Sequence, residues 1–144
     1  MRFAPILAAA AAAFTLAAAP VEVPLEEIPA QRLDPGQCAL FLWTRGLPPR
    51  RVFMALQAPA IARLKVGGRV LDLPRVAWEG EAVFGHPSMQ RFAGSGLELT
   101  VTIQADARSG LVGGAVAPTA TIEYRTADGW QTVIPAAGMV GCQP

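Results

Sequence analysis

The sequence predicts an all-β domain, a small antiparallel barrel or sandwich of about seven to nine short strands. Apolar and polar residues alternate along residues 97–104, as in a strand with one wet face. Gly67-Gly68 and Asp128-Gly129 are dipeptides typical of tight hairpin turns, and no long segment has helical periodicity. The only cysteines, Cys38 and Cys142, stand at the two ends of this region. We expect them to form a disulfide that joins the first and last strands as neighbours.

Residues 1–18 have the composition of a cleaved secretory signal peptide. Arg2 gives a positive start, residues 3–16 are almost entirely apolar, and alanines follow at the cleavage region. The apolar stretch is too short for a permanent span, so we expect no stable membrane span after cleavage. The abundance of Arg, Ala, Gly and Pro is typical of a GC-rich bacterial genome. The predicted location is therefore the periplasm or the exterior of a bacterium.

The predicted mature chain is formally neutral. Cleavage of the leader removes Arg2, which leaves eleven Arg and Lys residues and eleven Asp and Glu residues. An exported protein meets an oxidising compartment, which favours the Cys38–Cys142 disulfide. Closing a loop of about 100 residues is worth about 4 to 5 kcal/mol in the chain-entropy account. A neutral exported chain is a poor candidate for binding nucleic acid.

Residues 19–36 are predicted to be an extended N-terminal arm, and residues 37–144 a single β domain. The arm carries several acidic residues and four prolines, which exclude a helix of any length: Pro20, Pro24, Pro29 and Pro35. Its polarity indicates a linker outside the core, although a partner-binding tail is the alternative.

The first two strands are expected at 38–44 and 51–57. The first does not alternate simply, which indicates burial on both faces or a barrel seam. Around Gly67-Gly68 the pairing places one apolar face opposite one polar face. The predicted cross-strand pairs are Val66 with Arg69, Leu64 with Leu71, Ala62 with Leu73, Arg63 with Asp72, and Lys65 with Val70.

The later part of the domain is expected to contain short strands and an exposed loop over 74–88, and a Gly-rich loop over 108–118. A two-residue turn at Asp128-Gly129 would pair Tyr124 with Val133 and Ile122 with Pro135 on the core side. The outer side would then carry Trp130, Thr132 and Ile134 beside Glu123 and Arg125.

Catalytic residues are hard to identify in this sequence. The single histidine, His86, lies two residues from Ser88, but neighbours in sequence rarely have the geometry of a base and its nucleophile. We expect a surface or turn histidine. Glu79 and Glu81 could form a carboxylate pair, although an exposed acidic turn around Gly80 is the simpler interpretation. One histidine and two distant cysteines do not make a usual zinc site, and no cofactor is expected.

Charge distribution gives the main binding hypothesis. From Arg45 to Arg91 the chain carries eight Arg or Lys residues and only three acidic ones. This asymmetry could attract an anionic envelope polymer or an envelope protein, unless these residues pair with the acidic arm. Trp130 could stand outward beside Arg125 as an interface anchor, or lie beneath the Gly-rich loop. The candidate binding residues are therefore Arg50, Arg51, Arg63, Lys65 and Trp130.

These observations favour an exported, non-catalytic domain that binds a protein or another envelope component, as an inhibitor or assembly accessory. Two alternatives stay open from the sequence. One is a small hydrolase that uses His86 with Ser88, Glu79 or Glu81. The other is a carrier that holds a small apolar ligand inside a barrel.

Overall fold

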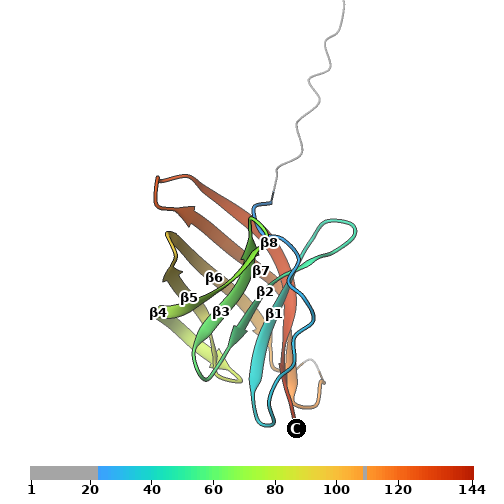
Figure 1. The fold of residues 1–144 in the computed structure, drawn as a ribbon. Coiled ribbons are helices and arrows are strands. Elements are labelled where there is room, and N and C mark those ends of the chain that lie inside the picture. The colour runs from blue at the N-terminus through green and yellow to red at the C-terminus, as the bar shows by residue number, and fades with distance from the viewer. Residues whose placement is uncertain (1–22, 109) are drawn as a thin grey trace, which may run out of the picture.

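A computed structural model describes residues 23–108 and 110–144, and the predicted signal peptide lies outside them. The described chain forms a closed barrel of eight antiparallel strands, each hydrogen-bonded to the next along the sequence (Figure 1). Their bounds are β1 Cys38–Thr44, β2 Arg51–Leu56, β3 Ile61–Val66, β4 Arg69–Val83, β5 His86–Gly94, β6 Leu97–Asp106, β7 Gly114–Thr126 and β8 Gln131–Cys142. This confirms the predicted fold class and selects the barrel over the sandwich.

The barrel closes where β1 meets β8, as predicted from the cysteines. Cys38 is paired with Cys142 at the end of this seam, and the two sulfurs form the disulfide across a separation of 104 residues. The seven residues of β1 all have partners in β8, from Cys38 to Thr44. The disulfide therefore links strands that the backbone ladder already joins.

Side chains from all eight strands fill the barrel interior. Along β6, Leu99, Val101 and Ile103 are buried, while the residues between them face outward. This confirms the predicted alternation. Phe53 and Phe92 meet edge to face in the core, with ring centroids 5.8 Å apart.

The β3–β4 hairpin has the predicted register throughout, from Val66–Arg69 to Ala62–Leu73. Arg63 donates two hydrogen bonds to the carboxylate of Asp72, at 2.7 and 2.8 Å. The interaction with Asp72 raises the pKa of Arg63. The turn residues and the charge pair both specified this register.

The β7–β8 hairpin differs from its predicted register by one residue. The turn has three residues, Ala127 to Gly129, because the backbone NH of Thr126 donates to the carbonyl of Trp130. Ile122 consequently pairs with Ile134, and Tyr124 pairs with Thr132. A one-residue slip exchanges the faces of a strand, so Ile134 is buried and Val133 is exposed. The predicted outward position of Ile134 was wrong.

Residues 74–88 form longer strands than expected. β4 continues to Val83, and only Phe84 and Gly85 separate it from β5. β5 pairs with β6 from Met89–Thr102 to Gly94–Leu97, whereas His86 and Pro87 pair only with the end of β4. The barrel wall is therefore split between β5 and β6 at the end that carries the disulfide.

The N-terminal arm runs beside the barrel (Figure 1), and it also supplies core residues. Leu25 is fully buried in the interior cluster, and Ile28 is buried with Ala39 and Met54 on the outer face of β1 and β2. The expectation that the arm contributes nothing to the core was wrong, because two apolar residues suffice to anchor an otherwise polar segment. In residues 23–108 and 110–144, no helix is long and apolar enough to cross a membrane.

Candidate functional site

Three of the predicted binding residues contact the N-terminal arm. Lys65 Nζ lies 3.5 Å from a carboxylate oxygen of Glu26. Arg63 donates to the side-chain oxygen of Gln31 at 2.8 Å, and Arg51 donates to the carbonyl of Pro29 at 3.0 Å. Much of the hydrogen-bonding capacity of these cations is thus used within the chain.

Arg50 lies apart from that arrangement. Its side chain is exposed, and its backbone NH donates to the hydroxyl of Thr44 at 3.0 Å. The structure therefore does not gather Arg50, Arg51, Arg63 and Lys65 into one open cationic surface.

Trp130 lies at the opposite end of the barrel from the disulfide. It is 50% exposed, and its ring meets that of Tyr124 edge to face at 5.9 Å. Its turn contacts the β5–β6 turn through a hydrogen bond from Ala127 to the carbonyl of Gly96. Gly113 of the Gly-rich loop instead accepts from Cys142 at the other end. The hypothesis that Trp130 lies beneath this loop was wrong.

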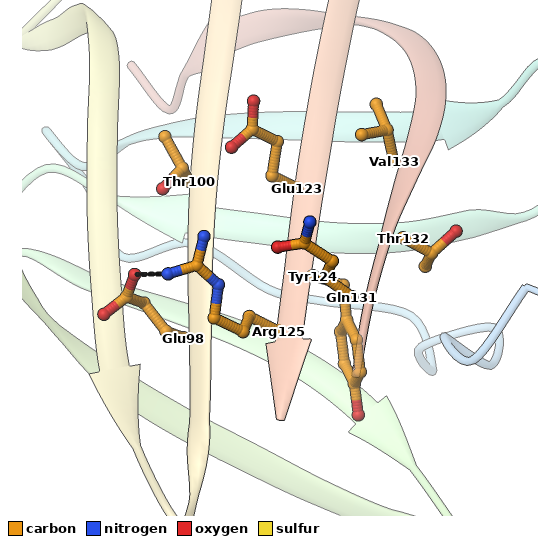
Figure 2. Close-up of a pocket in the computed structure, with 8 residues that line it drawn as sticks. All are labelled: Glu98, Thr100, Glu123, Tyr124, Arg125, Gln131, Thr132 and Val133. Atoms are coloured by element: carbon orange, nitrogen blue, oxygen red, sulfur yellow. Dashed lines mark ion pairs between the residues drawn. The ribbon is translucent and has the colours of Figure 1, made fainter. Parts of the chain in front are cut away.

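A groove of about 310 Å³ crosses the outer face of β6, β7 and β8 (Figure 2). The strand register aligns its side chains in two rows. One row contains Glu98, Arg125 and Gln131, and the other contains Thr100, Glu123 and Val133. Tyr124 and Thr132 complete the lining.

The groove presents both charges and several neutral hydrogen-bonding groups. Arg125 Nη1 lies 3.8 Å from a carboxylate oxygen of Glu98 (Figure 2). The two side chains are 56% and 40% exposed, so solvent screens this pair and it contributes little to stability. Arg125 therefore pairs with Glu98 rather than stacking on Trp130, and it can exchange this partner for another carboxylate at low cost.

His86 differs most from its predicted environment. The imidazole is fully buried, not on the surface, and neither nitrogen has a hydrogen-bond partner among the residues that the structure describes. The pKa of His86 is lowered to about 4, mainly by burial and also by the positive charge of Arg75, whereas the nearby backbone carbonyl of Cys38 opposes the shift. That carbonyl also accepts the NH of Gln57, and its geometry does not make it a hydrogen-bond partner of either imidazole nitrogen. The ring is therefore neutral at physiological pH.

The residues on which the hydrolase hypothesis depends lie in the same region as His86. Glu81, His86 and Ser88 line one pocket of about 240 Å³. Ser88 Oγ donates to the carbonyl of Glu79 at 3.4 Å, and the imidazole forms no bond to Ser88. Glu79 and Glu81 are both exposed. The residues are gathered, but the hydrogen bond that would activate a serine is not formed.

The sequence does not reveal the polar contact between Arg75 and Gln90 in the barrel wall. Arg75 donates to the side-chain oxygen of buried Gln90 at 3.1 Å, and its guanidinium lies 5.0 Å from the ring centre of Trp78. An outward β-bulge around Val76 changes the alternation of β4. Sequence periodicity cannot reveal such a bulge.

Among residues 23–108 and 110–144, no three His, Cys, Asp or Glu side chains are arranged to hold a metal ion. Comparisons with protein-family models, curated proteins and solved structures find no match to this chain.

Proposed function

We propose that this protein is an exported, non-catalytic domain that binds a protein of the bacterial cell envelope through the outer face of β6–β8. The observation that carries the proposal is the groove on this face, which holds Arg125 and several polar groups, and whose lining residue Gln131 directly follows half-exposed Trp130 in the chain. Trp, Tyr and Arg are the residues most often found at the energetic centres of protein interfaces.

The composition of the groove favours a protein over an anionic polymer. Glu98 and Glu123 lie in the groove with Arg125, so its charge is mixed rather than positive. Three of the basic residues proposed from the sequence as binding residues contact the N-terminal arm instead: Arg51, Arg63 and Lys65. A mixed surface suits a partner with charges of both signs and some apolar area, which Val133 would contact.

The interior of the barrel supports this choice over the carrier hypothesis. Large side chains, including Phe53, Phe92 and Leu99, are fully buried there, and Leu25 of the arm joins them. A filled interior leaves recognition to the outer surface.

The test compares two tryptophans that are similarly exposed on different parts of the barrel. Trp130→Ala should weaken capture of the envelope partner at least tenfold, since interface tryptophans commonly contribute more than 1.4 kcal/mol. Trp78→Ala is the matched control, because Trp78 is 61% exposed and lies on β4, which borders β3 and β5 rather than the strands of the groove. A photo-crosslinker at Val133 should also join the same protein, whereas one at exposed Val70 on β4 should not.

Equal loss of capture in both tryptophan variants would contradict the proposed surface. Retention on purified envelope polymer, with no crosslinked protein, would contradict the choice of a protein partner.

A further inference from the structure

The split in the barrel wall opens a second pocket, distinct from the groove near Trp130. It lies where β5 residues 86–88 and β6 residues 103–105 no longer pair, and its volume is about 240 Å³. Pocket residues come from β4, β5 and β6. We propose that this pocket binds a small neutral alcohol, whose hydroxyl bonds to His86 and whose carbon skeleton packs on Val83, Ile103 and Ala105.

The histidine supplies the polar part of the argument. A neutral imidazole carries one donor and one acceptor nitrogen, and neither has a partner among the described residues. A hydroxyl group can donate and accept, so it suits either nitrogen in either tautomer. His86 is fully buried and is one of the residues that line the pocket, so a partner that enters there would satisfy a group that is otherwise unpaired.

The surrounding charges favour a neutral ligand. The positive charge of Arg75 acts on the His86 site and disfavours a cation there. Glu81 also lines the pocket, and its carboxylate disfavours an anion. The remaining lining is largely apolar, and its volume accommodates a single ring or a short chain.

Binding requires a small adjustment, because the imidazole nitrogens are covered in the unliganded protein. Ser88 is the lining residue best suited to move. It is half-buried, and its hydroxyl is held by one long hydrogen bond to the carbonyl of Glu79. Rotation of this side chain breaks that one hydrogen bond and leaves the backbone of β5 in place.

The single histidine makes the test direct. Isotope labelling of histidine gives the imidazole signals of His86 alone, without assignment of other residues. The probes are benzyl alcohol, toluene, benzoate and benzylamine, which share a ring and differ in the polar group. Benzyl alcohol should cause a saturable shift of the imidazole resonances at millimolar concentration. Toluene should bind about tenfold more weakly, since it lacks the hydrogen bond, and the two ions should cause no saturable shift.

Two variants distinguish binding in this pocket from an indirect effect on the imidazole signals of His86. Ala105→Leu fills the pocket and should abolish the response to benzyl alcohol. Glu81→Gln changes an exposed side chain, so the fold is retained; it should leave benzyl alcohol binding intact and increase binding of benzoate. An imidazole that responds to no probe would mean that the site accepts only water, and would overturn the proposal. A response to the ions alone, or one unchanged in Ala105→Leu, would also overturn it.

Discussion

Gly138 shows how a single residue determines whether the barrel seam can close. A Cβ atom at this position would overlap the carbonyl oxygen of Phe41 on β1. Gly138→Ala should therefore separate β1 from β8 locally and destabilise the fold by about 1 to 3 kcal/mol or more. Gly141→Ala is a matched control on the same strand, since a Cβ there meets nothing within 4 Å. Urea unfolding measures both, and equal stability of the two variants would contradict the predicted overlap.

His86 makes the stability of the protein depend on pH. Its pKa is about 4 in the folded chain and 6.5 when unperturbed, so the unfolded chain binds more protons between these values. The contribution of the neutral ring is complete above pH 6.5 and is lost as the pH falls toward 4. The expected loss is about 3 kcal/mol.

Urea unfolding at pH 7 and pH 4, in wild type and His86→Gln, measures this contribution. The variant cannot titrate at this position, so the difference between the two pH dependences isolates the histidine from the carboxylates. Parallel pH dependences would show that the ring is not buried in its neutral form.

At the scale of elements, the N-terminal arm should behave as part of the domain. Leu25→Ala removes a fully buried side chain from the interior cluster and should cost about 2 to 5 kcal/mol. Leu47→Ala makes the same change at a residue that is 96% exposed, and should alter stability by less than about 0.5 kcal/mol. Equal unfolding midpoints would show that the arm is not docked in solution.

The two hairpins show what the sequence could and could not predict. Around Gly67-Gly68, the turn, the apolar face and the Arg63–Asp72 pair all specify one register, and the structure has it. Around Asp128-Gly129, the dipeptide was assigned a two-residue turn, but Gly129 at φ 91° closes a three-residue turn. One residue of turn length decided which face of β8 is buried.

The candidate sites were less predictable than the strands, because they depend on contacts across the barrel. Neighbouring residues gave no sign that His86 would be buried, since its burial follows from the β4–β5 hairpin and the split beside β6. The groove at Glu98 and Arg125 likewise requires the register of three strands. Trp130 could be proposed from the sequence because the predicted hairpin places it directly after the turn and on the outer side.

At the scale of the whole molecule, the disulfide and the β1–β8 ladder close the same ring. Each strand otherwise pairs with its neighbour in sequence, so this seam is the only strand pairing that joins the two ends of the described barrel. The cross-link limits the freedom of the unfolded chain, and its loop of 104 residues should contribute about 4 to 5 kcal/mol. That is comparable with the net stability of many small domains.

Replacement of Cys38 and Cys142 together by alanine should therefore lower the free energy of unfolding by about 4 to 5 kcal/mol. Reduction of the wild type should have a similar effect, whereas the alanine variant should not respond to reductant. Urea unfolding followed by tryptophan fluorescence measures all four conditions. Since seven backbone pairs remain along the seam, the cross-linked and uncross-linked folded states should have the same far-ultraviolet circular dichroism. A variant as stable as the oxidised wild type would show that the ladder alone closes the barrel.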